Sequence, residues 1–189
     1  MIFRMGCLTK IIITILIIFI AFLFIFNSHW FQRLFYPIPH FELVQEESGK
    51  YNIDPYLIMA MMRVESKFNE NAQSSRGASG LMQIMPETAK WIAQELKVED
   101  YHEDMLRKPE TNITFGIWYM NHLIREFDGN IVAALAAYNG GQTNVRKWIN
   151  TGVWSGKYED QDDVPFQETR NYLYKVITDY KIYKKIYDS

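Results

Sequence analysis

The chain has 189 residues, of which 48% are hydrophobic and 15% aromatic, a composition typical of one folded domain with a short additional segment. Arg4, Lys10 and Arg33 are the basic residues before position 42 and no acid precedes that position, so residues 42–189 carry 17 basic and 22 acidic residues. Because this net charge of −5 is unsuited to polyphosphates, nucleic acid is not an expected partner.

The first predicted element is an apolar helix. Residues 11–26 contain no charge and only Thr14 as a polar residue, and residues 27–31 extend the run toward Trp30, a residue favoured at membrane interfaces. The run is shorter than the ~20 residues of a usual membrane-spanning helix. We interpret residues 1–31 as an uncleaved signal-anchor that forms one transmembrane helix. A cleaved signal peptide is the alternative, but few small residues are present to form its cleavage site.

Charge predicts the orientation of this segment. Arg4 and Lys10 lie at its amino-terminal end, and basic residues tend to remain on the cytoplasmic side. The following domain is therefore expected on the outer face, with membrane contact through the amino-terminal helix. Residues 32–41 contain Pro37 and Pro39 and are interpreted as a stiff juxtamembrane spacer.

Metal and cofactor chemistry is not indicated. Cys7 is the single cysteine, so the chain can form no intrachain disulfide and no cysteine cluster. The four histidines show no metal-ligand spacing. The segment from Gly77 to Gly80 lacks the lysine and the preceding strand of a phosphate-binding loop. We expect no metal site and no cofactor.

Beyond the spacer, the pattern predicts a mainly α domain. Asp54 followed by Pro55 is a helix-start signal, and it predicts a helix with Glu65 near its end. Pro86 likewise suits the first position of a helix. Further helices are expected over residues 86–96, 112–127, 131–138, 144–149 and 165–187. A small hairpin near residues 151–158 is the only β structure expected.

The segment from Gly77 to Pro86 is the most unusual part of this domain. Its two glycines, Gly77 and Gly80, can adopt positive φ, and Gln83 places one amide among apolar side chains, where an unpaired polar group is costly. Apolar surroundings raise the pKa of a carboxyl group. Glu65 at a helix end, facing such a wall, indicates an acid/base residue in a groove for a neutral polymer. No second acid stands out, and Ser79 lacks the spacing of a serine nucleophile.

Several sequence blocks in this domain resemble a known family. In order, they are Glu65-Ser66, GASGLMQIMP at 77–86, AYNGG at 137–141, NVRKW at 144–148 and PFQETRNY at 165–172. Together they resemble the catalytic domain of the soluble-type lytic transglycosylases, which are lysozyme-like enzymes. The resemblance covers roughly residues 42–187. It implies a lysozyme-like helical domain over residues 42–189 that acts on peptidoglycan glycan strands. This substrate agrees with the orientation predicted from charge, in which the chain crosses a bacterial cell membrane once and the domain lies outside.

The resemblance also implies the reaction and the site. Glu65 would be the single general acid/base that cleaves the MurNAc-GlcNAc linkage and forms 1,6-anhydroMurNAc, because an attacking hydroxyl held in the substrate needs no separate base. The implied substrate-binding residues are Ser66, Met82, Gln83, Tyr138, Asn139, Glu168 and Tyr172. For some of these a structural role is the alternative: a helix-end hydrogen bond for Ser66, core packing for Met82, a helix end for Asn139 and a surface ion pair for Glu168.

Two other functions remain open from the sequence. A lysozyme-type hydrolase on the same fold would need a second carboxylate that activates water. A non-catalytic peptidoglycan-binding scaffold would keep the groove without needing Glu65.

Overall fold

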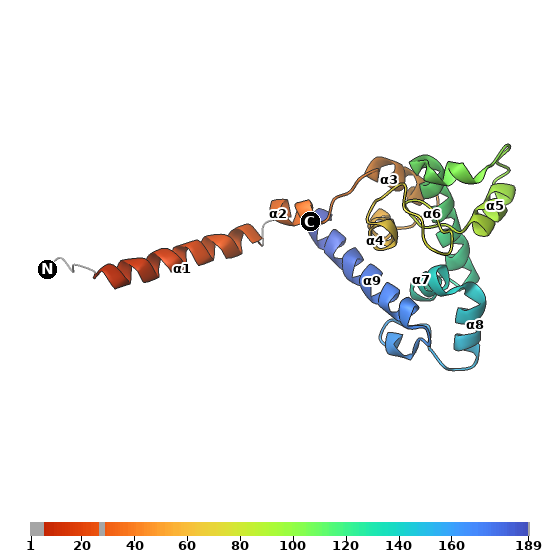
Figure 1. Cartoon of the computed structure of the whole chain (residues 1–189). Helices are drawn as coiled ribbons and strands as arrows, with labels where there is room; N and C mark the ends of the chain where they lie inside the picture. The colour runs from red at the N-terminus through yellow and green to blue at the C-terminus, as the bar shows by residue number, and fades with distance from the viewer. Residues whose placement is uncertain (1–5, 27–28, 189) are drawn as a thin grey trace. The chain divides into compact units, whose positions relative to one another are not determined.

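The computed structural model of this protein describes residues 6–26 and 29–188. The chain divides into two compact units, one of Met1–Pro37 with Ile186–Ser189 and the other of Ile38–Lys185. Their helices are labelled in Figure 1.

The first unit contains α1 (Cys7–Phe26), α2 (His29–Phe35) and the last residues of α9. Within the described residues, none of the helices has both the length and the apolar character needed to cross a membrane. The predicted transmembrane helix is therefore not confirmed, and its apolar run at residues 11–26 falls short of ~20 residues. Arg4, used to predict the orientation, and residues 27–28, expected to lengthen the run, lie outside the described residues.

Residues 32–41, which were predicted to form a spacer, are partly helical. Helix α2 includes residues 32–35, so the first part of the spacer is helical. The helix ends before Pro37 and Pro39, as expected because a residue that precedes proline disfavours helical geometry.

The second unit is mainly α-helical. It contains α3 (Phe41–Gly49), α4 (Pro55–Ser66), α5 (Pro86–Glu95), α6 (Pro109–Glu126), α7 (Ile131–Gly140), α8 (Gln142–Asn150) and α9 (Gln167–Tyr187), with 3-10 turns at Glu103–Arg107 and Gln161–Asp163. Among the described residues, β structure is limited to isolated bridges that join Ser79 to Gln73 and to Ile84. The mainly α prediction is confirmed.

The hairpin predicted near residues 151–158 is wrong. This segment forms turns, with positive φ at Gly152 (69°) and Gly156 (80°). Trp154 is buried there and its indole Nε1 donates to the Lys157 carbonyl at 3.1 Å. The glycines therefore fold the segment around a buried tryptophan instead of pairing two strands.

Helix starts follow their capping signals. The Asp54 carboxylate accepts a hydrogen bond from the Tyr56 amide at 2.9 Å and Pro55 begins α4. Asn130 caps α7 in the same way, through the Ala133 amide at 3.0 Å. Helix α6 begins at Pro109, three residues before the predicted start at 112, because proline again occupies its first turn.

Helix α6 organises the core of the second unit. It packs against α3, α5 and α7, and α7 in turn packs against α8. Figure 1 shows α7 and α8 at the lower end of α6, with α5 beside its upper part. Four alanines of α7, at positions 133, 134, 136 and 137, are fully buried and permit this close packing. The end of α7 is thereby held beside the segment that precedes α5.

Candidate active site

Glu65 lies in the last turn of α4. The helix ends directly after Ser66, because Lys67 and Phe68 adopt left-handed conformations with φ of 52° and 65°. The Ser66 hydroxyl donates to the Leu81 carbonyl at 2.8 Å. Ser66 therefore ties the end of α4 to the Gly77–Pro86 segment, and a substrate-binding role for it stays a prediction.

The Gly77–Pro86 segment is a tight loop held by its own backbone. Ser79 and Ile84 exchange two backbone hydrogen bonds, of 3.0 and 3.1 Å, and the Gly80 amide donates to the Ala72 carbonyl at 2.9 Å. Gly80 has a φ of 80°, and a Cβ at this position would overlap the Asn112 side chain and the Leu106 carbonyl. Glycine is required here both by conformation and by space.

Asn112 holds this loop from α6, a role that the sequence analysis missed. Its amide nitrogen donates to the Ser79 and Leu106 carbonyls at 2.9 and 2.8 Å, and its Oδ1 accepts from the Met82 amide at 2.7 Å. The side chain is buried and all three bonds are to backbone atoms. A polar residue on the apolar face of α6 was the available sequence signal.

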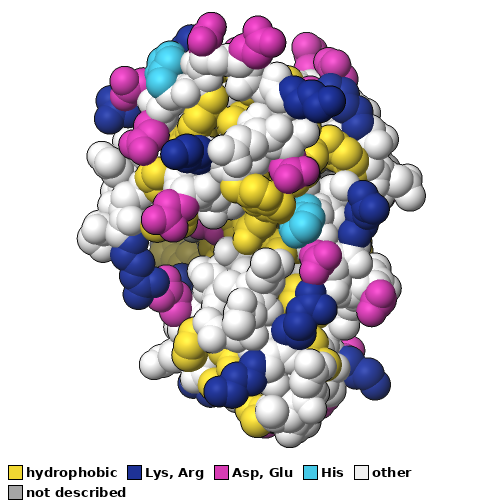
Figure 2. Space-filling view, turned by 90° about the vertical axis from the view of Figure 1, so that its right-hand side faces the viewer, with side chains coloured by type: hydrophobic (Ala, Val, Ile, Leu, Met, Phe, Trp, Pro, Cys, Tyr) yellow, Lys and Arg dark blue, Asp and Glu magenta, His cyan; other side chains and the backbone are white. Residues whose placement is uncertain are grey.

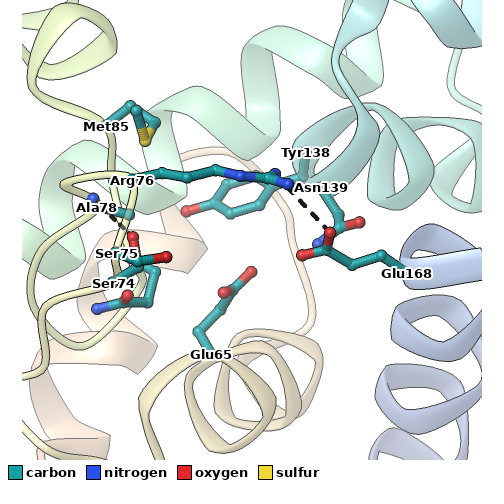
Figure 3. A pocket seen from close by; sticks show the side chains of 10 residues that line it. Glu65, Ser74, Ser75, Arg76, Ala78, Met85, Tyr138, Asn139 and Glu168 are labelled. Atoms are coloured by element: carbon teal, nitrogen blue, oxygen red, sulfur yellow. Dashed lines mark hydrogen bonds and ion pairs between the residues drawn. The ribbon is translucent and has the colours of Figure 1, made fainter. Parts of the chain in front are cut away.

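A cleft of about 310 Å³ opens above the end of α4. Five of the residues predicted from the sequence line it, namely Glu65, Gln83, Tyr138, Asn139 and Glu168, together with Ser74, Ser75, Arg76, Ala78 and Met85. Figure 3 shows Glu65 pointing up into this space, with the serine-containing loop on one side and Glu168 on the other. The cleft thus gathers side chains from α4, the loop, α7 and α9.

The Glu65 carboxyl has a strongly raised pKa. Burial raises it from 4.5 to about 7, the Tyr172 hydroxyl opposes this rise, and the negative charge of Glu168 adds to it. Because an apolar environment disfavours the charged form, a large fraction of Glu65 is protonated near neutral pH. Such a group can give a proton and later take one back.

Tyr172 approaches Glu65 from α9 without lining the cleft. Burial and the neighbouring Glu65 charge raise the pKa of Tyr172 well above its usual value, so its hydroxyl keeps its proton. That hydroxyl is buried and lacks a hydrogen bond of regular geometry within the described residues. The hydroxyl therefore acts on Glu65 as a nearby dipole that favours the carboxylate.

Tyr138 and Met82 form one structural pair. The Tyr138 hydroxyl donates to the Met82 carbonyl at 2.9 Å, and burial raises the pKa of Tyr138 well above its usual value. The Met82 side chain is fully buried, and its thioether fills the space where Gly116 of α6 has no Cβ. The structure therefore places Met82 in the core, and its backbone supports a residue that lines the cleft.

Gln83 and Asn139 line the cleft, and the side-chain amide of each is hydrogen-bonded through one of its two polar atoms. Gln83 adopts a positive φ of 48°, and its Nε2 donates to the Ala72 and Gly80 carbonyls at 3.1 and 2.9 Å. The Asn139 Oδ1 accepts from the buried Thr169 hydroxyl at 2.9 Å. These bonds fix both side chains, leaving the Gln83 oxygen and the Asn139 nitrogen as the polar atoms that they can offer to a ligand.

An ion pair spans the mouth of the cleft. The Arg76 guanidinium and the Glu168 carboxylate lie 3.8 Å apart, and their side chains are 79% and 69% exposed. Figure 3 shows this pair as a dashed line that joins the loop to α9. Arg76 was not predicted as a site residue, since an arginine in an exposed loop has no distinctive sequence pattern. In the described part of the chain, no group of three or more His, Cys, Asp or Glu side chains could hold a metal ion.

The fold and the site together define the class of protein. A helical domain that holds a carboxyl of raised pKa in a cleft with polar walls is lysozyme-like. The Transglycosylase SLT domain family matches residues 42–161, and the chain belongs to this family.

Individual relatives agree with this family. The soluble lytic murein transglycosylase of Salmonella typhimurium is 33% identical over 171 residues, which are 80% of this chain and 26% of the relative. The 70 kDa soluble lytic transglycosylase SLT70 of Escherichia coli superimposes with a TM-score of 0.76 at 29% identity, over 86% of this chain and 29% of that one. An inactive mutant of the lytic transglycosylase Slt of Pseudomonas aeruginosa superimposes with a TM-score of 0.72 at 30% identity, over 81% of this chain and 25% of that one. The chain spans about a quarter of the length of the curated relatives it matches.

Proposed function

We propose that this protein is a peptidoglycan lytic transglycosylase in which Glu65 is the single general acid/base. The observation that carries this proposal is the pKa of about 7 of Glu65 at the floor of an open cleft. Membership of the SLT family and relatives named as murein transglycosylases support the choice of substrate. Peptidoglycan lies outside the cytoplasmic membrane, and the proposed activity belongs there.

In the first step, Glu65 acts as an acid. Its carboxyl gives a proton to the oxygen of the β-1,4 bond between MurNAc and GlcNAc, the bond from C1 of MurNAc to this oxygen breaks, and GlcNAc leaves with a new hydroxyl. Positive charge then develops on the muramyl ring, next to the newly formed Glu65 carboxylate. The buried setting strengthens the attraction between these two charges.

In the second step, Glu65 acts as a base. Its carboxylate removes the proton from the muramyl C6 hydroxyl, whose oxygen bonds to C1 and closes the 1,6-anhydro ring. The proton is thereby returned to Glu65 and no water is consumed. Because the attacking hydroxyl belongs to the same sugar, proximity supplies what a second carboxylate would supply in a hydrolase.

Hydrolysis is the second candidate, and the position of Glu168 favours it. The structure brings this second carboxylate into the cleft that contains Glu65. Its side chain is 69% exposed and is paired with Arg76, so solvent and the cation both stabilise its charge. Because Glu168 is paired with a cation at the exposed mouth of the cleft, we place transglycosylation first.

Product analysis tests the proposal. Purified peptidoglycan is digested with the full chain, with Glu65→Gln and with Glu168→Gln, and the products are identified by mass spectrometry. We expect 1,6-anhydromuropeptides from the wild type and from Glu168→Gln, and none from Glu65→Gln.

Two other outcomes would contradict the proposal. Reducing-end products that require both Glu65 and Glu168 would identify a hydrolase. A folded wild-type protein that binds peptidoglycan without cleaving it would identify a non-catalytic scaffold.

A further inference from the structure

A second hollow lies beside the Glu65 cleft, between α5 and α6. It has a volume of about 460 Å³, which is within the range of ligand pockets, and its walls include Glu87, Thr88, Trp91, Tyr119 and His122. Figure 2 shows hydrophobic side chains gathered in the middle of this face, with a histidine beside them. None of these residues takes part in the proposed reaction.

Three aromatic rings line this hollow, those of Trp91, Tyr119 and His122, and the Trp118 ring packs against two of them. We call these four residues the aromatic shelf. The Trp91 ring meets those of Trp118 and His122 edge to face, at centroid distances of 5.1 and 4.9 Å. The rings of Trp118 and His122 are nearly parallel, with 7° between their planes. Trp91, Tyr119 and His122 remain partly exposed. The rings therefore pack against one another while part of the surface of the shelf stays open.

The shelf continues the Glu65 cleft along both of its walls. On one wall, Met85 lines the cleft and Glu87, two residues further along the chain, lines the hollow. On the other wall, the Tyr119 ring packs against the Tyr138 ring with centroids 5.4 Å apart, and Tyr138 lines the cleft. A linear ligand seated over Glu65 would therefore reach the shelf without leaving the protein surface.

Polar groups around the shelf are free to bind a ligand. Within the described residues, the side chains of Glu87, Thr88 and Gln142 make no hydrogen bond, although all three line the hollow. They offer a carboxylate, a hydroxyl and an amide. Glu126 also lines the hollow and is paired with Arg146. Two carboxylates beside the shelf disfavour an acidic ligand such as a peptide with free carboxyl groups.

We infer that the aromatic shelf is a distal saccharide subsite, which binds N-acetylhexosamine units of the same glycan strand whose bond lies over Glu65. A sugar has apolar C–H faces that pack on aromatic rings and hydroxyls that pair with neutral and acidic side chains, and it carries no charge. This assignment rests on the proposed function for the choice of strand. The assignment also predicts that long glycan strands bind more tightly than short fragments, because only long strands span both hollows.

Binding of N-acetylglucosamine oligomers tests the shelf separately from cleavage. In the full chain carrying Glu65→Gln, which prevents turnover, calorimetry compares the hexamer with the dimer. We expect Trp91→Ala in this background to weaken hexamer binding roughly tenfold, since a lost aromatic contact of about 1.5 kcal/mol has that effect. Trp91→Phe should retain most of the affinity. Trp30→Ala, which removes an exposed tryptophan of the other unit, should change nothing.

A second set of variants controls for loss of binding that is caused by misfolding. Gln142→Ala and Glu87→Gln alter exposed positions beside the shelf, and each should weaken hexamer binding by a few fold without a change in melting temperature. The Trp91 indole N–H signal, identified in nuclear magnetic resonance spectra by its loss in Trp91→Phe, should shift when hexamer is added, whereas the Trp30 signal should not.

The inference is overturned if Trp91→Ala keeps its melting temperature and binds the hexamer as tightly as its parent. It is also overturned if peptide-bearing muropeptides shift the Trp91 signal while the hexamer does not, because the occupant would then be a peptide. If the wild type releases anhydromuropeptides and Trp91→Ala leaves the dependence on strand length unchanged, the subsite assignment is wrong and the proposed function stands. If the hexamer binds at the shelf but the wild type cleaves no peptidoglycan, the subsite assignment stands and the proposed function is wrong.

Discussion

The Tyr138 hydroxyl donates a hydrogen bond of 2.9 Å to the backbone carbonyl of Met82, joining the end of α7 to the loop before α5. Met82 is fully buried, so no solvent is available to replace this donor. The bond also orients the Tyr138 ring between the Glu65 cleft and the aromatic shelf. One tyrosine therefore contributes both to loop stability and to the shape of the cleft.

Tyr138→Phe removes this donor and leaves a buried carbonyl unpaired. We expect the free energy of unfolding to fall by about 1–3 kcal/mol, measured by urea denaturation. Tyr174→Phe, at a residue 57% exposed, is the matched control and should change stability by less than about 0.5 kcal/mol. Equal stability of the two variants would show that the Met82 carbonyl finds another partner.

Glu65→Gln should stabilise the protein in a pH-dependent way. The pKa of Glu65 is raised from 4.5 to about 7, so the folded state holds this proton more tightly than the unfolded state. Wild-type stability therefore falls as pH rises from about 4.5 through about 7, and the loss remains at higher pH. Glutamine removes this penalty, on the order of 1–3 kcal/mol at pH 8.

Thermal unfolding at several pH values checks this expectation. The variant should melt above the wild type at pH 8, and the difference should shrink toward zero at pH 4. Glu99→Gln, at an exposed turn, serves as the control. A difference that is the same at pH 4 and pH 8 would exclude ionisation of Glu65 as its cause.

Tyr172→Phe and Glu168→Gln should move the pH profile of cleavage in opposite directions. The proposed first step needs protonated Glu65, so kcat/KM should fall as pH rises through about 7. The Tyr172 hydroxyl lowers the pKa of Glu65, and its loss should shift this decline to higher pH. The Glu168 charge raises the pKa of Glu65, and its removal should shift the decline to lower pH. Shifts of the same sign would contradict the proposed electrostatics.

Gly80→Ala should be far more damaging than Gly77→Ala. Both glycines have positive φ, of 80° and 91°, so both substitutions introduce backbone strain of about 1 kcal/mol. At Gly77 the added Cβ meets no atom within 4 Å, whereas at Gly80 it would overlap Asn112 and the Leu106 backbone. We expect Gly80→Ala to cost several times more than Gly77→Ala in chemical denaturation and to displace the loop that carries Gln83. Similar losses for the two variants would mean that α6 moves aside without cost.

Several helices could be predicted because their start signals are local. Asp54 with Pro55, Pro86 and Asn130 each begin a helix in the structure, through a side-chain bond to a nearby amide or through a preset φ. Helix α3 was not predicted, because His40 precedes it in a left-handed conformation and makes no capping bond. The turns around Trp154 were mistaken for a hairpin, since glycine-bounded segments suit both structures.

Within the site, Glu65, the loop glycines and Gln83 were selected from the sequence because their residue types are unusual together in a core. The family resemblance added Tyr138, Asn139 and Glu168, which also line the cleft. Tertiary structure alone decided which partner each side chain has. Asn112, 30 positions from Met82, anchors the loop, and Arg76 reaches Glu168 from the opposite wall of the cleft. It also decided that Glu65 is buried enough to raise its pKa to about 7 and that the aromatic shelf adjoins the cleft. Burial and long-range contact depend on how helices pack, and local residue patterns do not encode that packing.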